Sequence, residues 1–171
     1  MKNLSWKFLI TFFFAVSFAG INARCVINTK TTTIIIVRHA EKATTEGKDP
    51  ELTTEGKQRA ERLSASFRGV SPDAFYSTDY IRTKHTLEPW AKQTSKEIQS
   101  YDATKQPEFA ESLLKQPGKT IVIAGHSNTV CRLVNLLLNE EKYKDLADSE
   151  YDKIFVVTIE NNKKTVKVLS Y

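Results

Sequence analysis

The apolar residues of this chain gather in short runs, and two of the runs are apolar at almost every position. They are "TIIIV" at 33–37 and "TIVIAG" at 120–125. A strand that is apolar on both faces is typical of the buried centre of a parallel sheet. Shorter runs at 74–77 and 97–101 predict two further strands. The pattern therefore predicts a sheet whose central strands are 33–37 and 120–125.

Amphipathic segments lie between these strands and predict four helices, at about 53–70, 80–94, 106–118 and 127–139. The apolar positions that mark the first and the last of them are Ala60, Leu63, Phe67 and Val70, and Val130, Leu133, Val134, Leu137 and Leu138. Strands that alternate with helices indicate a three-layer α/β/α sandwich with a mostly parallel central sheet. The final runs "KIFVVTIE" and "TVKVLS", separated by the polar "NNKK", predict a C-terminal β-hairpin.

The first 23 residues have a different character. Two lysines precede an apolar run from Phe8 to about Gly20, and a small residue, Ala23, ends the segment. This layout predicts a secretory signal peptide at 1–23 and a periplasmic or secreted protein. The run is shorter than the ~20 residues of a membrane span, so an uncleaved anchor is the second interpretation. A lipid anchor on Cys25 is a third, which the preceding Arg24 disfavours. We expect 24–32 to be a polar lead-in and 33–171 to be one folded domain.

Composition and charge limit the function further. Removing residues 1–23 lowers the formal charge from +5 to +3. This mild surplus fits a small anionic substrate, and it is too weak to indicate nucleic-acid binding. Export would permit a disulfide between Cys25 and Cys131, although the apolar helix around Cys131 favours a buried thiol. The three histidines, His39, His85 and His126, show no metal-ligand spacing.

Charged side chains follow the two central strands directly. Arg38 and His39 come after the first strand, and His126 comes after the second. Parallel strands end at the same edge of a sheet, and ligands bind beyond that edge. Arg82 lies in the first turns of the helix at 80–94, and guanidinium groups match phosphate oxygens in paired hydrogen bonds. Two arginines and two histidines at one edge predict a phosphate-binding site.

Three segments, "VRHAEK", "YSTDYIRTKHTL" and "IAGHSNT", resemble the motifs of the histidine phosphatase (phosphoglycerate mutase-like) superfamily, in the order that the family has them. "LTTEGKQRAERL" is similar to the family's first helix. The resemblance covers about 33–160. It implies that His39 is the nucleophile that becomes phosphohistidine, and that Arg38, Arg82 and His126 bind the phosphoryl group. Such a site works without a metal or other cofactor.

The resemblance also implies a general acid for the leaving oxygen. Asp102, between the second arginine and the second histidine, is our first choice, and Glu41 is the second. An Asp that precedes a helix can also be a simple cap, so that reading of Asp102 stays open. Ala40 replaces the family's usual glycine after the histidine. Asn128 and Thr129 either orient His126 or cap its helix.

The chain has little sequence between its motifs. It is therefore most similar to the small phosphohistidine-phosphatase-like branch, which has an open site. The expected function is an exported histidine acid-type phosphatase that hydrolyses phosphomonoesters or phosphohistidine on a small molecule or a phosphoprotein. A phosphoglycerate mutase-type phosphotransferase and a non-catalytic phosphate-binding module are the alternatives. Ser127 stands where phytase-like relatives carry an acid. The sequence does not indicate an oligomeric state.

Overall fold

The computed structural model describes residues 30–44 and 47–171. The predicted signal peptide and Cys25 lie outside these residues. The strands are β1 (Thr32–Arg38), β2 (Ala74–Ser77), β3 (Ile98–Ser100), β4 (Thr120–Gly125), β5 (Lys153–Glu160) and β6 (Lys163–Ser170). The helices are α1 (Thr54–Ser66), α2 (Ile81–Gln93), η1 (Ala103–Lys105, a 3₁₀ turn), α3 (Gln106–Leu114) and α4 (Ser127–Leu138).

The six strands form one sheet in the order β3-β2-β4-β1-β5-β6. β1, β2, β3 and β4 pair in parallel, and β5 and β6 add an antiparallel pair at the β1 side. The predicted mostly parallel sheet and C-terminal hairpin are thus confirmed. The hairpin turns at Asn161 and Asn162, which both have positive φ (51° and 62°), as a two-residue type I′ turn requires.

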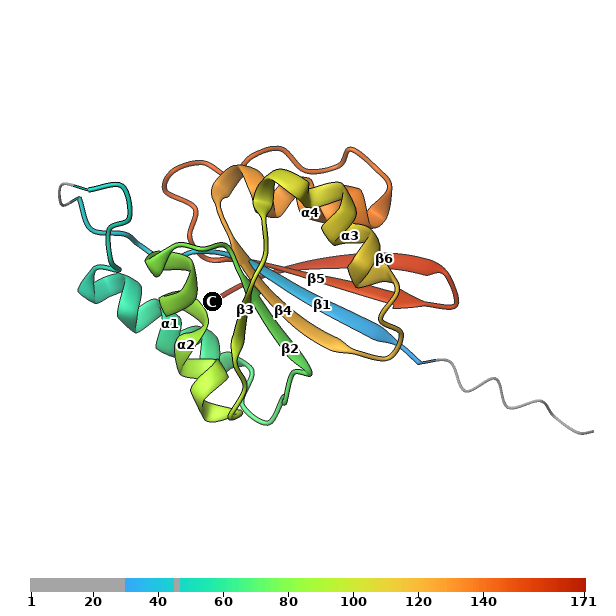
Figure 1. The fold of residues 1–171 in the computed structure, drawn as a ribbon, viewed down its shortest axis with the longest axis horizontal. Helices are drawn as coiled ribbons and strands as arrows, with labels where there is room; N and C mark the ends of the chain where they lie inside the picture. The colour runs from blue at the N-terminus through green and yellow to red at the C-terminus, as the bar shows by residue number, and fades with distance from the viewer. Residues whose placement is uncertain (1–29, 45–46) are drawn as a thin grey trace, which may run out of the picture.

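Helices cover both faces of the sheet, α1 and α2 on one and α3 and α4 on the other (Figure 1). The alternation of β1 explains this arrangement. Ile34 and Ile36 point into the core that contains residues of α3 and α4, whereas Ile35 and Val37 point into the core beneath α1 and α2. All four side chains are at most 2% exposed, so the apolar run correctly predicted a strand buried on both faces.

One detail of the first predicted helix was wrong. α1 ends at Ser66, and Val70 is exposed on the turn beyond it, where Gly69 adopts a φ of +88°. The turn after the C-cap residue Phe67 changes the chain direction, and this removes Val70 from the predicted apolar face. Phe67 still packs into the core, because its ring stacks on Trp90 at 4.7 Å.

The first turn of α2 is capped by a residue from a distant part of the chain. The N-cap residue of α2, Tyr80, makes no side-chain capping hydrogen bond. The backbone N–H of Ile81 instead donates to the carboxylate of Asp49, 3.0 Å away, from the loop that follows β1. A cap from a distant loop fixes that loop against α2.

No helix within 30–44 and 47–171 has the length and apolar character needed to cross a membrane.

Gly56, in the first turn of α1, provides a test of the packing behind the site. A Cβ at this position would lie 2.3 Å from the backbone oxygen of Glu41. We expect Gly56→Ala to destabilise the fold by about 2 kcal/mol, because backbone must move, although the same change in an unpacked helix would stabilise by about 1 kcal/mol. Urea unfolding measures the difference. The exposed Gln58→Ala on the same helix is the control, with a change within about 0.5 kcal/mol. A stabilised Gly56→Ala protein would refute the contact.

Candidate active site

The two strand-end histidines lie side by side. β1 and β4 are neighbours in register, with Arg38 opposite Gly125, and the backbone N–H of His39 donates to the Gly125 carbonyl at 2.8 Å. The next residues along both strands therefore leave the sheet together. The ring centroids of His39 and His126 are 5.4 Å apart, with the planes at 65°.

His39 is held in one tautomer. Its Nδ1 lies 2.8 Å from the carbonyl oxygen of Ala40. A carbonyl only accepts, so Nδ1 carries the proton and Nε2 keeps its lone pair. Burial lowers the pKa of His39 to about 4, although the Ala40 bond opposes it, and the positive charges of Arg82, His126 and Arg38 add to the lowering. The imidazole is thus neutral at neutral pH, as a nucleophile must be.

The residue after His39 is also fixed. Ala40 is fully buried, and its N–H donates to Thr86 Oγ1 at 2.9 Å. Thr86 Oγ1 in turn donates to the Arg82 carbonyl at 2.7 Å. The methyl group that replaces the expected glycine is therefore accommodated, and α2 is tied directly to the end of β1. Sequence reasoning had given Thr86 no role.

Arg38 ends β1 and is 4% exposed. Its Nη1 donates to three carbonyls of the loop after α4, those of Ala147, Asp148 and Glu150, at 2.8, 3.2 and 3.1 Å. Its Cζ lies 4.2 Å from the ring centroid of Tyr151. Its Nε is buried and has no hydrogen-bond partner among the described residues.

Arg82 reaches the site from the first turn of α2. Its Nη1 lies 3.4 Å from Asp49 Oδ1, and its Cζ lies 4.2 Å from the ring centroid of Tyr80. Its Nη2 approaches His126 Nδ1 at 3.5 Å. Like that of Arg38, its Nε is buried without a partner in the described part of the chain. A buried, unpaired cationic donor costs free energy, and two of them at one place fit a site built for an anion.

His126 is the N-cap residue of α4. Its backbone N–H donates to Thr129 Oγ1 at 2.8 Å, so Thr129 both caps the helix and holds the histidine backbone. The ring is held separately, because Nε2 lies 3.0 Å from Thr78 Oγ1. Burial lowers the pKa of His126 to about 4, and the charges of Arg82 and Arg38 contribute. This histidine is therefore also neutral in the ligand-free site.

The two candidate acids differ in position. Asp102 lines the cavity beside His126, but it is exposed, and its Oδ1 accepts from the N–H and hydroxyl of Thr104 at 2.9 and 2.7 Å. These bonds to Thr104 hold its pKa below the usual value. Glu41 forms a two-pronged ion pair with Arg59, with contacts of 2.6 to 2.9 Å. Burial raises the pKa of Glu41, but the Arg59 bonds outweigh it and leave a net lowering. Both roles stay predictions.

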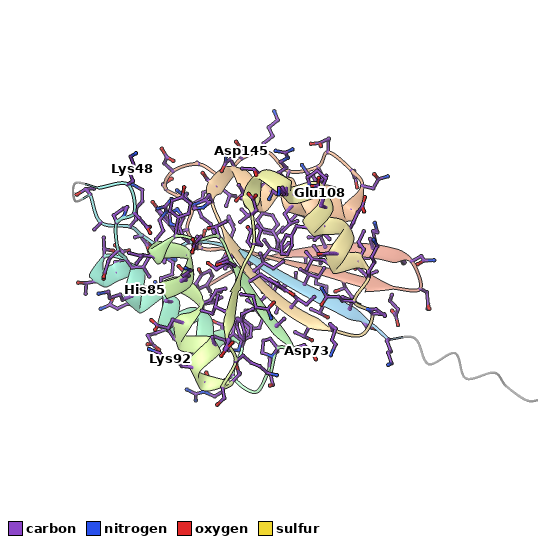
Figure 2. The ribbon with its side chains drawn as sticks, viewed as in Figure 1. Lys48, Asp73, His85, Lys92, Glu108 and Asp145 are labelled. Carbon is purple, nitrogen blue, oxygen red and sulfur yellow. The ribbon has the colours of Figure 1, made fainter. Side chains whose placement is uncertain are left out.

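A cavity of about 610 Å³ opens beside the histidine pair. Its lining includes Tyr80, Arg82, Tyr101, Asp102, His126 and Asn128. This size is within the usual range for small-molecule sites. His85 lies on α2 among residues that face α1, so it is not part of the cavity (Figure 2). Cys131 is buried on α4 and has no disulfide partner among residues 30–44 and 47–171.

No cluster of three or more metal-ligand side chains occurs within residues 30–44 and 47–171. The positive charge at the site comes from the chain's own arginines. Together with a neutral imidazole that presents a free Nε2, they form an arrangement that has the chemistry to bind a phosphoryl group and to attack it.

Comparisons with known proteins agree with this class. A sequence model of the histidine phosphatase superfamily (branch 1) matches residues 34–112, which include Arg38, His39 and Arg82. No curated protein matches the chain. Over residues 34–112 the chain is therefore similar to the histidine phosphatase superfamily.

Solved structures share the fold at low sequence identity. The protein histidine phosphatase SixA complexed with tungstate has a TM-score of 0.66 and 17% identity, covering 81% of this chain and 96% of SixA. Phosphoserine phosphatase from Entamoeba histolytica, in complex with phosphoserine, has a TM-score of 0.63 and 18% identity, and the match covers 80% of this chain and 95% of the phosphatase. Phosphoglycerate mutase from Plasmodium falciparum has a TM-score of 0.58 and 16% identity, and the match covers 83% of this chain and 91% of the mutase.

Proposed function

We propose that this protein is an exported, metal-independent histidine acid-type phosphatase that hydrolyses phosphomonoesters or phosphohistidine through a phosphohistidine intermediate on His39. The observation that carries the proposal is the bare Nε2 of a neutral His39 next to two arginines, Arg38 and Arg82, whose buried Nε–H donors are unpaired among the described residues. That arrangement supplies a nucleophile and an anion site together. The signal-peptide layout of residues 1–23 supports export.

In the proposed reaction the phosphoryl oxygens bind Arg38, Arg82 and His126. His39 Nε2 attacks phosphorus, the bond to the leaving oxygen breaks, and the phosphoryl group stays on His39. Water then attacks the phosphoenzyme and releases inorganic phosphate. Phosphoryl transfer needs mainly positioning and charge stabilisation, which the two arginines supply.

The leaving group would occupy the cavity between Tyr80 and Asp102. The volume of this cavity and its position beside His126 fit a small phosphorylated molecule or a phosphorylated side chain. Two proteins that share the fold act on these two types of substrate by name. SixA is a protein histidine phosphatase, and the Entamoeba histolytica protein is a phosphoserine phosphatase. Asp102 remains a candidate proton donor in this pocket.

The test is phosphate release from p-nitrophenyl phosphate by the purified protein, with and without EDTA. We expect release at the same rate in both, because the site's cations belong to the chain. A rate that collapses in EDTA and returns with a divalent metal would contradict the proposal. Exchange of phosphate between phosphoglycerates that outpaces release would favour the mutase alternative instead.

A further inference from the structure

The geometry points to His126, rather than a carboxylate, as the group that delivers a proton to the leaving oxygen, with Thr78 and Thr83 fixing the tautomer that lets it do so. This inference rests on the proposed phosphatase function. Its carrying observation is a chain of three hydrogen bonds behind the His126 ring.

This series of hydrogen bonds starts at Thr83, which is fully buried. Its Oγ1 lies 2.8 Å from the Tyr80 carbonyl and 3.1 Å from the Thr78 carbonyl. Carbonyls only accept, so the one hydroxyl proton of Thr83 points to them. The Thr83 oxygen can then only accept from its remaining neighbour.

That neighbour is the hydroxyl of Thr78, with the two oxygens 3.0 Å apart. Because Thr83 has no second proton to give, the Thr78 hydroxyl donates to it. The Thr78 oxygen must therefore accept from His126 Nε2, which lies 3.0 Å away on its other side. His126 Nε2 carries the proton.

The other side of the ring agrees independently. Arg82 Nη2, which can only donate, faces His126 Nδ1 at 3.5 Å. Both ends of the imidazole thus specify the same form, with Nε2 protonated and Nδ1 bare. The bare nitrogen lies on the side of Arg82, where the phosphoryl group would bind.

A bare Nδ1 that faces phosphate oxygens is repulsive until it takes up a proton. We expect the substrate to bind as the monoanion and to pass its proton to Nδ1, which gives an imidazolium beside a dianionic phosphoryl group. When His39 Nε2 attacks, the P–O bond breaks with its electron pair on oxygen, and the Nδ1 proton moves to that oxygen. The products are a neutral alcohol, neutral His126 and phosphorylated His39. In the second step Nδ1 takes a proton from the attacking water.

The carboxylates are less suited to this task. A general acid must hold a proton when the leaving oxygen departs, and His126 receives that proton from the bound monoanionic substrate. Glu41 is occupied by Arg59, and Asp102 already accepts two hydrogen bonds from Thr104, which favour its ionised form. His126 also approaches Arg82 directly, with 3.5 Å between Nδ1 and Nη2, whereas the hydrogen bonds of Asp102 go to Thr104.

The first test needs no turnover. ¹⁵N NMR of the His126 ring in the purified protein should show a protonated Nε2 and a bare Nδ1. Thr83→Val keeps the shape but removes the acceptor, which frees the Thr78 hydroxyl to donate to Nε2 and shifts the ring toward the Nδ1–H form. Circular dichroism confirms folding, and Thr78→Ser is the conservative control that retains the wild-type tautomer. An Nδ1–H ring in the wild type would overturn the inference.

The second test compares leaving groups, because only a basic leaving oxygen needs the acid. For Thr83→Val we expect kcat/KM for an alkyl phosphate to fall about 10-fold more than that for p-nitrophenyl phosphate, and for His126→Gln about 100-fold more. Asp102→Asn should change both substrates by the same factor. If Asp102→Asn alone discriminates against the alkyl phosphate, the acid is Asp102 and the inference is wrong. Failure of the phosphatase function itself would appear separately, as a wild type inactive on both substrates.

Discussion

Replacing His39 with alanine will lower kcat/KM for p-nitrophenyl phosphate by about 10⁴-fold or more, because the covalent route disappears with the nucleophile. The loss should fall on kcat. Arg38 and Arg82 still present their guanidinium groups in the variant, so substrate binding should change little. Steady-state kinetics on both proteins measure the effect.

Isolating the phosphohistidine intermediate tests the role of His39 directly. The wild type, quenched during turnover of ³²P-labelled substrate, should carry label that is stable in alkali and lost in acid, as phosphohistidine is. The His39→Ala protein should carry none. Inorganic phosphate should inhibit or stabilise both proteins comparably, which is the control for an intact anion site. Label on the alanine variant, or undiminished turnover, would remove His39 from the proposed role.

The sequence predicted the central parts of this site because they are local. A run that is apolar on both faces specifies a central strand, and the residues that follow it must lie at the carboxyl edge. That reasoning placed Arg38, His39 and His126 together without further information. The amphipathic helix after β2 placed Arg82 at the same edge.

The supporting contacts could not be predicted because they join residues far apart in the chain. Asp49 caps the N–H of Ile81, 32 residues away, and Thr86 holds the N–H of Ala40, 46 residues away. Nothing in the polar loop around Asp49 distinguishes this carboxylate from its neighbours. Only the three-dimensional path of the loop brings it to α2.

The ambiguity over carboxylates has the same origin. Glu41 and Asp102 both stand at positions where an acid is chemically plausible, and sequence alone cannot show what each one contacts. The structure gives Glu41 a partner in Arg59 that lies 18 residues further on, and gives Asp102 a local cap. Interactions across space, rather than residue type, determine whether a carboxylate is ionised.

The second large effect is expected at Arg82. Arg82→Ala should lower kcat/KM by about 10³-fold, because a preorganised cationic donor at the phosphoryl oxygens is lost. Arg82→Lys should recover part of this, since it restores the charge but not the fork of N–H donors. Inhibition by inorganic phosphate should weaken in the same order. Kinetics and phosphate inhibition, measured on both variants, test the prediction.

Asp49 offers a matched control with the opposite sign. Its carboxylate lies 3.4 Å from Arg82 Nη1 and competes with a bound anion for the guanidinium charge. Asp49→Asn keeps an oxygen for the N–H of Ile81 but removes the competing charge, so phosphate should bind a few-fold more tightly while α2 stays capped. If both Arg82→Ala and Asp49→Asn leave phosphate inhibition unchanged, the anion does not bind at Arg82. Opposite shifts in the two variants would place it there, because no general loss of folding can move the affinity in both directions.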